Sequence, residues 1–381
     1  IFYNQITSLK DIKKTPMIGL QSLDQTFYMN SVLQCLSHTT SLTNYFINPE
    51  KLPLIQNNKI AIIAPFLPQL CPVLQQLFYH LWTDEPNSYY NPQAFKNIID
   101  EIDHSFKDFK SNDVKYFVQF ILKRIHDELN DIDNSFVYDN INGSEQNINL
   151  YNSYQNHFDN FKMNNRSIIS DIFYGTIQIE YECQNCKMKN QMGENIPYIK
   201  YNYQDYFFIY FSLEEVWKFK ISNQIPNMNH MNMELNPNKE INLIDCFNYY
   251  YHRKYNVFCG PCEQCKYNFA QIIQRQKLYK LPKNLILIFN RDRGNENNFK
   301  ILFPEILDTN KIVIEHTGNY QLYAVVTFNF SSSQFMAYCR SPVDNCWYLY
   351  NDCNVSLIND DRKNEIQENG LTYILFYTIK Q

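Results

Sequence analysis

Glycine is scarce in this sequence. Only 8 of its 381 residues are glycine, whereas glycine makes up about 7% of an average protein. Glycine is the residue that most readily takes a positive φ and lets a ligand approach the backbone closely. Few positions of the chain can therefore serve as left-handed turns or as glycine-lined contact sites.

The chain also lacks an excess of positive charge and a long apolar run. Its 34 Lys and Arg residues are outnumbered by 39 Asp and Glu, which gives a formal net charge of -5. Proteins that bind nucleic acid or anionic lipid usually present a basic field, so we expect neither partner. The most apolar stretch, residues 60–74, is interrupted by prolines and is too short to cross a bilayer. We expect no membrane insertion.

Cysteine occurs in an odd number, 11. Four of these cysteines form two C-x-x-C pairs, a spacing more typical of metal ligands in a reducing compartment than of a secreted disulfide framework. We therefore expect an intracellular, reducing location. No signal peptide is visible, but the sequence begins with Ile1 rather than methionine, so the chain can be a fragment of a longer protein.

The secondary structure that the sequence predicts changes from helices to strands along the chain. Apolar spacing predicts helices over residues 26–47, 70–82 and 113–129, the first with Thr26 as its N-cap. Residues 140–166 are polar and rich in Asn, which predicts a long loop. From residue 172 onward, runs rich in Tyr, Phe, Ile and Val predict strands. Helices followed by strands indicate an α+β fold with a mostly antiparallel sheet.

The two C-x-x-C pairs adjoin predicted strands. Cys183 and Cys186 follow one strand, and Cys262 and Cys265 precede another much later in the chain. Two such pairs make a tetrahedral zinc site when their strands lie side by side. Cys259 offers a rival pair with Cys262, but the distance to the next strand favours Cys262 with Cys265. The pattern predicts a structural Zn2+, and reduced cysteines without metal are the alternative.

Four separated segments resemble the ubiquitin-specific protease family, the papain-like cysteine deubiquitinases of peptidase family C19. GLQSLDQTFYMNSVLQCLSHTTSLTNYF is similar to the cysteine box, and YQLYAVVTFNFSSSQFMAYCRSPVDNCWYLYND to the histidine box. LYKLPKNLILIFNR resembles the strand before the last third of the domain, and SNDVKYFVQFILKRIHDEL the helix that meets the ubiquitin tail.

The resemblance implies one papain-like domain over residues 1–381. Its helical thumb would occupy residues 17–170, and its antiparallel β palm residues 171–381, with β fingers around residues 176–275. Many family members carry zinc at the tip of the fingers, which adds weight to the four-cysteine site.

The resemblance also assigns catalytic positions, and most of them carry other residues here. The nucleophile should stand immediately before the YMNS run, where this chain has Phe27. Ser22 stands at the oxyanion-stabilising position and Gln334 at that of the histidine base, while Asn351 matches the orienting residue and is followed by Asp352. Phenylalanine has no nucleophilic atom, and glutamine cannot accept a proton near neutral pH. These substitutions predict a degenerate site, without catalytic residues, in a chain that is not an enzyme.

No other cysteine is an obvious replacement. Cys35 lies further along the same predicted helix, and its expected role is packing. Cys346 and Cys353 flank Asn351, but no histidine lies in that segment. A relocated Cys–His pair is the less favoured alternative.

Three functions follow as hypotheses. The chain could be a catalytically inactive scaffold or structural subunit of a larger protein assembly, a module that binds ubiquitin or a ubiquitin-like protein, or, least favoured, a thiol-dependent deubiquitinase. Asp113 matches an acidic family residue that receives the basic end of the ubiquitin tail, which favours binding. The companion acidic position, three residues later, is Tyr116, which counts against it.

Overall fold

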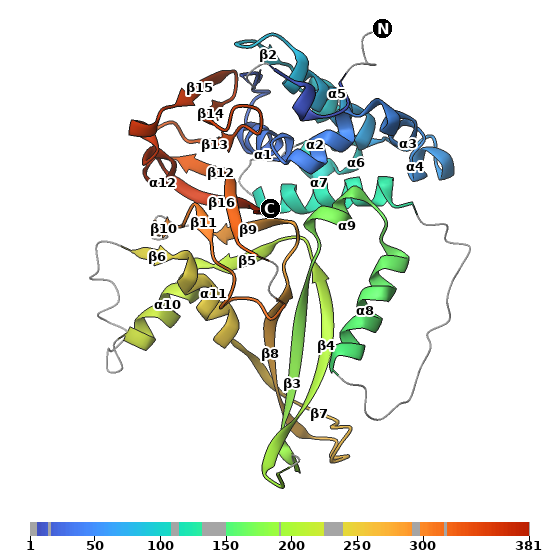
Figure 1. Ribbon diagram of the computed structural model, residues 1–381, viewed down its shortest axis with the longest axis vertical. Helices are drawn as coiled ribbons and strands as arrows, with labels where there is room; N and C mark the ends of the chain where they lie inside the picture. The colour runs from blue at the N-terminus through green and yellow to red at the C-terminus, as the bar shows by residue number, and fades with distance from the viewer. Residues whose placement is uncertain are drawn as a thin grey trace.

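A computed structural model of the chain describes residues 6–13, 17–107, 114–131, 150–189, 192–224, 239–291, 298–315 and 318–380. Figure 1 shows a helical region at one end, a sheet beneath it, and a narrow ribbon of long strands that extends away from both. Helices fill the first part of the described chain and strands dominate the second. The predicted α+β class is confirmed.

The first part of the chain is helical, and most of its helices share one apolar core. Its helices are α1 (Phe27–Ser37), α2 (Thr40–Ile47), α3 (Leu52–Gln56), α4 (Lys59–Ile63), α5 (Leu70–Thr83), α6 (Gln93–Ile102), α7 (Val114–Leu129), α8 (Leu150–Asn164) and α9 (Ile168–Phe173). Short 3-10 turns η1 (Leu9–Asp11), η2 (Pro49–Lys51) and η3 (His104–Phe106) lie between them. The predicted stripe of α1 is fully buried: Met29, Val32, Leu33 and Leu36. Burial of this stripe holds α1 against the sheet.

The segment predicted as a single helix over residues 26–47 is two helices. Thr39 is extended, with φ -75 and ψ 95, and so ends the helical hydrogen-bond ladder between α1 and α2. The hydroxyl of Thr43 donates to the Ser37 carbonyl at 2.5 Å. This side-chain bond satisfies a carbonyl that the ended helix leaves open. The break turns α2 across the end of α1.

The prediction of a loop over residues 140–166 is wrong in its described part, because α8 occupies residues 150–164. Aromatic side chains two turns apart attach this helix to the rest of the chain. The ring of Tyr154 lies 4.1 Å from that of Tyr279, and the ring of Phe161 lies 4.8 Å from that of Tyr174. Tertiary packing of these rings outweighs the low helix propensity of an Asn-rich segment.

A mostly antiparallel sheet forms the centre of the molecule, in the order β15-β14-β13-β12-β16-β9-β5. Its strands are β5 (Ile209–Ser212), β9 (Asn284–Asn290), β12 (Tyr320–Asn329), β13 (Gln334–Arg340), β14 (Trp347–Asn351), β15 (Asn354–Ile358) and β16 (Leu371–Ile379), and β11 (Ile306–Leu307) pairs with β12. Alternate residues face opposite sides: Ile286 and Ile288 pack with the helices of the first region, whereas Leu285 and Leu287 face a second core. Both faces of the sheet are therefore covered.

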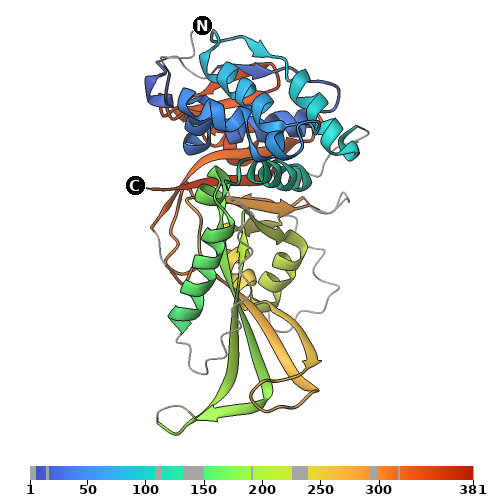
Figure 2. The ribbon, with the colours of Figure 1, turned by 90° about the vertical axis from the view of Figure 1, so that its right-hand side faces the viewer.

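The long ribbon is a second antiparallel sheet in the order β4-β3-β8-β7. Its strands are β3 (Gly175–Lys189), β4 (Asn195–Tyr206), β7 (Lys254–Gly260) and β8 (Ala270–Lys280). The two hairpins diverge toward the far end of the molecule (Figure 2). The register between β3 and β4 shifts between Cys183 and Lys187, so a bulge lies where the first C-x-x-C pair occurs.

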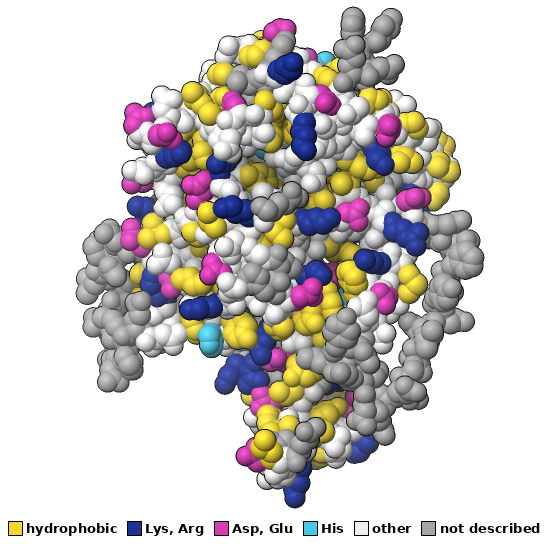
Figure 3. All heavy atoms as spheres, in the orientation of Figure 1, with side chains coloured by type: hydrophobic (Ala, Val, Ile, Leu, Met, Phe, Trp, Pro, Cys, Tyr) yellow, Lys and Arg dark blue, Asp and Glu magenta, His cyan; other side chains and the backbone are white. Residues whose placement is uncertain are grey.

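Shorter elements complete the fold. They are β1 (Gly19–Leu20), β2 (Tyr89–Tyr90), α10 (Leu213–Gln224), β6 (Glu240–Asn242), α11 (Leu243–His252), β10 (Lys300–Leu302), η5 (Asp360–Arg362) and α12 (Glu365–Glu368). Within the described ranges, no helix is both long enough and apolar enough to span a membrane. Acidic and basic side chains are interspersed over the face shown in Figure 3.

Candidate functional site

The start of α1 lies against the turn that follows β14. The side-chain amide of Asn30 donates to the Asp352 carboxylate at 2.8 Å, and the backbone N–H of Leu20 donates to the Asp352 carbonyl at 2.9 Å. At Gly19, an added Cβ would lie 2.5 Å from the backbone oxygens of Asp352 and Cys353. Glycine is required here because the two backbones approach each other closely. These contacts join the cysteine-box segment to the histidine-box sheet.

Asp352 has a left-handed backbone, with φ 51. Burial raises the pKa of its carboxyl group, and hydrogen bonds from the side chains of Asn30 and Ser22 oppose part of that rise. Asn351 ends β14 and pairs with Asn354 across the turn. Of the expected site residues, the structure thus brings Ser22 and Asp352 together, with Asn351 next to them.

Phe27 and Gln334 each begin a secondary-structure element. Phe27 opens α1, is half-buried and packs against the core of the helical region, and the hydroxyl of Ser31 donates to its carbonyl at 2.8 Å. Thr26 precedes α1 as predicted. Its hydroxyl accepts a hydrogen bond from a backbone N–H earlier in the chain, at Leu23, and does not cap the helix. Gln334 opens β13, is half-buried and pairs with Asn329 of β12. A phenyl ring and a carboxamide stand at the positions that the resemblance assigns to the thiol and the imidazole.

A buried histidine lies at the other end of α1. The Nδ1 atom of His38 is 2.8 Å from the Gln34 carbonyl, which identifies Nδ1 as the protonated nitrogen, and the Tyr350 hydroxyl then donates to Nε2 at 3.1 Å. Burial lowers the pKa of His38 to about 4, although its bond to Gln34 raises the value somewhat. His38 is therefore neutral, and it connects α1 to β14.

The cysteines of the cysteine-box and histidine-box segments differ in exposure. Cys35 and Cys339 are fully buried, with sulfur atoms 3.9 Å apart between α1 and β13. Burial raises the pKa of the Cys339 thiol well above its ordinary value. Cys346 is exposed and Cys353 half-buried. Burial and the nearby Asp352 charge raise the pKa of Cys353, and a backbone hydrogen bond from Ser22 opposes part of that rise.

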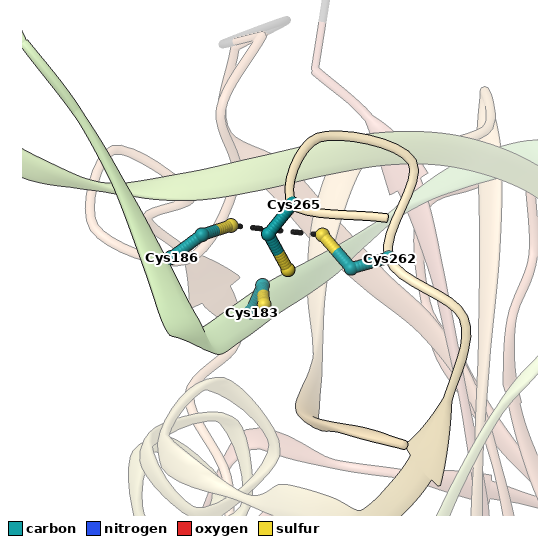
Figure 4. Close-up of side chains that lie close together, drawn as sticks. All are labelled: Cys183, Cys186, Cys262 and Cys265. Atoms are coloured by element: carbon teal, nitrogen blue, oxygen red, sulfur yellow. Dashed lines mark hydrogen bonds between the residues drawn. The ribbon is translucent and has the colours of Figure 1, made fainter. Parts of the chain in front are cut away.

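Four cysteines converge at the far part of the β ribbon. Figure 4 shows Cys183 and Cys186, from the bulge of β3, facing Cys262 and Cys265 of the loop between β7 and β8. All four sulfur atoms lie within 4.8 Å of one another, and those of Cys186 and Cys262 are 3.6 Å apart. A tetrahedral zinc site with Zn–S bonds of about 2.3 Å has sulfur atoms about 3.8 Å apart. The donor set therefore fits Zn2+.

Backbone N–H groups favour the thiolate at Cys262, whereas burial raises the pKa of the Cys186 thiol. Desolvation would raise the pKa of Cys262, but N–H groups of Cys265 and Gln264 and the thiols of Cys183 and Cys186 outweigh it and lower the pKa to about 7. Lys266, with φ 60, completes the tight turn behind the ligands. Cys259 is exposed on β7, paired with Gln271, and lies outside the cluster.

The acidic positions of the α7 segment give a mixed result. Asp113 lies outside the described residues. The Tyr116 hydroxyl donates to the carboxylate of Asp103, a residue 13 positions earlier in the chain. Our interpretation of the sequence missed Asp103, because only the tertiary structure shows its proximity to Tyr116.

The comparisons with known proteins agree with this geometry. The sequence model of the family described as ubiquitin carboxyl-terminal hydrolase (UCH) matches residues 18–377. The chain belongs to this family. The expected resemblance to the ubiquitin-specific proteases is thereby confirmed.

Individual relatives are similar along most of the chain. "Ubiquitin carboxyl-terminal hydrolase 2" of Bos taurus is 24% identical over 389 residues, which cover 95% of this chain and 55% of the relative. "Ubiquitin carboxyl-terminal hydrolase 15" of Xenopus tropicalis is 28% identical over 173 residues, 45% of this chain and 17% of the relative. The chain thus spans about half the length of the first of these relatives, and its match to the second covers 17% of that protein.

Solved structures share the fold. The SAGA Ubp8/Sgf11/Sus1/Sgf73 DUB module bound to ubiquitin aldehyde matches with a TM-score of 0.62 and 18% identity over 97% of this chain and 70% of that one. The Ubp8-Sgf11-Sgf73-Sus1 SAGA DUB module matches with a TM-score of 0.58 and 18% identity, covering 97% and 69%. The papain-like deubiquitinase fold that the resemblance implies is confirmed.

The expectation that the chain is not an enzyme is wrong. It depended on the side chains of Phe27 and Gln334, whereas the hydrolase family matches residues 18–377 and a relative named as a hydrolase aligns with 95% of the chain. Fold and sequence similarity are spread over the whole core, so two substituted positions do not remove the chain from its class. The comparisons point to the cysteine-type ubiquitin hydrolases.

Proposed function

We propose that this chain is a ubiquitin-recognising domain of the ubiquitin carboxyl-terminal hydrolase class. The observation that carries the proposal is the contact between Asn30 and Asp352, which brings the two boxes of the family together. The fold shared with a module bound to ubiquitin aldehyde supports it. In this proposal ubiquitin lies between the helical region and the β ribbon, with its tail directed toward the start of α1.

Titration calorimetry with purified ubiquitin tests this proposal. We expect a single-site isotherm for the chain. As a negative control, a ubiquitin-sized protein of unrelated fold should give no heat beyond dilution. Absence of saturable heat with ubiquitin, in a sample shown to be folded by circular dichroism, would contradict the proposal.

We further propose that Cys183, Cys186, Cys262 and Cys265 hold one structural Zn2+. Support comes from the four converging thiols and from N–H groups that favour the thiolate at Cys262. Such a site would fix the hairpins β3–β4 and β7–β8 to each other and so shape the ribbon that faces ubiquitin. Elemental analysis of protein purified without added metal should give about one zinc per chain, and a metal-free folded sample would contradict the assignment.

A second candidate function is that of a subunit in a larger protein assembly. It is favoured by apolar side chains exposed around α3 and α4: Leu54 52%, Ile62 72%, Ile63 69% and Phe66 84%. Leu54, Ile62 and Ile63 line an open cavity of about 1070 Å³, together with residues at the ends of α7 and α8 and at the start of α9. Exposed apolar patches commonly mark protein contacts.

Photo-crosslinking in native cells tests the assembly. A photoreactive residue at position 62, or at the neighbouring position 63, should give one discrete crosslinked species. With the probe at position 63, the double variant Ile62→Asp, Phe66→Asp should lose this species. Ile244 on α11, exposed to 44%, provides the matched control: Ile244→Asp should leave the species intact. The chain in native cell extract should also elute from a size-exclusion column ahead of the purified chain. Equal elution volumes would contradict membership in an assembly.

A further inference from the structure

A small pocket lies between the start of α2 and the central sheet. Its volume is about 180 Å³, below the roughly 300–1,000 Å³ of pockets that hold a drug-sized molecule. Thr40 and Ser41 of α2 form one side, and residues of β9, β12, β13 and β16 form the other. Among the described lining residues none is acidic, His38 is neutral, and Arg340 carries a positive charge.

Asn284, at the start of β9, supplies a buried amide to this pocket. It stands two residues before Ile286, whose side chain packs with the helices of the first region. Alternate residues of a strand face the same side, so the Asn284 carboxamide also faces the helices, beside its strand partner Thr378. Asn284 is 4% exposed, and none of the described residues bonds to its carboxamide. Since nearly all buried polar side chains have a hydrogen-bond partner, this amide is a donor available to a ligand.

A second buried donor comes from the residue after β13. Ser341 lines the pocket and is 1% exposed. Its oxygen accepts the N–H groups of Val343 and Asp344 at 3.2 Å and 3.4 Å. In the part of the chain that the structure describes, no group accepts the Ser341 proton. The hydroxyl can therefore donate this proton to a ligand.

Arg340 ends β13 and supplies the charge. Its Nη1 atom lies 3.0 Å from the carboxylate of Glu305, which is 54% exposed, and its Nε atom donates to the Asn345 carbonyl at 3.4 Å. A guanidinium has five N–H donors. These two bonds leave donors for a second anion, although Glu305 offsets part of the positive charge.

The start of α2 adds further donors. The preceding residue, Thr39, makes no capping bond, because its hydroxyl bonds to that of Tyr323 at 2.8 Å. The first N–H groups of a helix have no acceptor within it and carry a partial positive charge. Helix N-termini bind phosphate groups for this reason.

We propose that this pocket binds a small oxyanion of the phosphate class, held by the Asn284 amide, the Ser341 hydroxyl, the Arg340 guanidinium and N–H groups of α2. The donors reach the pocket from a helix and from two strands, which suits a tetrahedral anion with acceptors in several directions. The volume suits a phosphoryl group without a nucleoside. The bound anion would join α2 to β9 and β13 and so fix the helical region on the sheet. This inference does not depend on ubiquitin recognition.

The experiment uses inorganic phosphate as the probe. Phosphate replaces chloride at constant ionic strength, the Tm of the chain is measured, and ³¹P nuclear magnetic resonance gives the dissociation constant. We expect a saturable rise in Tm, because a ligand that binds only the folded chain stabilises it. Phosphate also stabilises proteins generally by exclusion from their surface, but that effect does not saturate and is the same in every variant.

Variants identify the pocket as the site. Asn284→Leu keeps the branched shape of the side chain and removes its donor. It should weaken phosphate binding roughly tenfold, the scale of a hydrogen bond to a charged group, without lowering the Tm in chloride. Arg340→Gln should weaken binding at least as much. Arg253, which lies 3.4 Å from Glu215 and does not line the pocket, is the matched control, and Arg253→Gln should leave binding unchanged.

A blocked phosphoserine, titrated in the same way, distinguishes the two sources of the anion. Tighter binding than that of inorganic phosphate would assign the site to a phosphoryl group carried on a side chain, and weaker or equal binding to free phosphate; both support the inference. Absence of saturable binding to either probe would overturn it. Equal affinities in the unmodified chain, Asn284→Leu and Arg340→Gln would also overturn it.

Discussion

The Asn30 side chain donates to the Asp352 carboxylate at 2.8 Å, although 322 positions of sequence separate the two residues. This bond connects the first turn of α1 to the turn after β14. Asn30 is 3% exposed, so its loss cannot be compensated easily by water. The junction of α1 with the sheet therefore depends on a contact between the first and last parts of the chain.

Replacing Asn30 should destabilise the fold. Asn30→Ala removes the buried amide donor of the Asp352 carboxylate and leaves it the Ser22 side chain, which costs about 1–3 kcal/mol of unfolding free energy. Urea denaturation checks the change. The exposed Asn57, whose side chain donates to the Pro53 carbonyl of the preceding helix, is the control, and Asn57→Ala should cost less than about 0.5 kcal/mol. Equal effects of both variants would show that the Asn30–Asp352 bond contributes nothing.

Gly19→Ala should disturb the same edge from the backbone side. The new methyl group would meet two carbonyl oxygens at 2.5 Å, so the backbones must separate, at a cost of about 1–3 kcal/mol. A thermal melt should show a lower Tm and weaker ubiquitin binding together. Gly193, with open space around its Cβ position and φ +79, is the control, since Gly193→Asn suits a left-handed turn. An unchanged Tm for Gly19→Ala would contradict the close approach.

His38 should make stability depend on pH. Its folded-state pKa is about 4, below the ordinary value of 6.5, so the unfolded chain binds the proton more readily. The contribution is fully present above pH 6.5 and is lost as the pH falls toward 4, by about 3 kcal/mol at most.

Urea midpoints at several pH values check this expectation. His38→Gln should flatten the slope between these two pH values, whereas substitution of the exposed His252 by Gln should not. A slope that is the same in His38→Gln and in the unmodified chain would contradict a neutral buried His38.

Zinc content should follow the four clustered cysteines and not the fifth. Cys183→Ser and Cys265→Ser should each lower the zinc content and loosen the β ribbon before the rest unfolds, because metal binding and local folding are coupled. Cys259→Ser should leave the zinc content unchanged, since Cys259 lies outside the cluster. Elemental analysis with hydrogen exchange of the ribbon measures both effects. Loss of zinc in Cys259→Ser would contradict the assigned ligand set.

Periodicity and spacing predicted much of this molecule. The buried stripe of α1, the antiparallel sheet and the pairing of Cys183 and Cys186 with Cys262 and Cys265 follow from local patterns. Side-chain direction and C-x-x-C geometry are local properties, so the sequence carries them directly.

The features that the sequence did not predict depend on distant contacts. The break at Thr39 has no glycine or proline to mark it, and α8 is held by rings from β8 and from the residue after α9. Asp103 meets Tyr116 only in the tertiary structure. The family and the fold were predicted correctly, whereas the expectation that the chain is not an enzyme was wrong, because it depended on two side chains, Phe27 and Gln334, and not on similarity along the whole core.

Ubiquitin recognition is the central claim, and the most direct test is nuclear magnetic resonance of ¹⁵N-labelled ubiquitin titrated with the unlabelled chain. Saturable shifts or broadening are expected in the ubiquitin tail and on one continuous face of its globular body, because in the proposed complex the start of α1 and the β ribbon contact both. A spectrum of ubiquitin that stays unchanged in the presence of excess folded chain would contradict this claim.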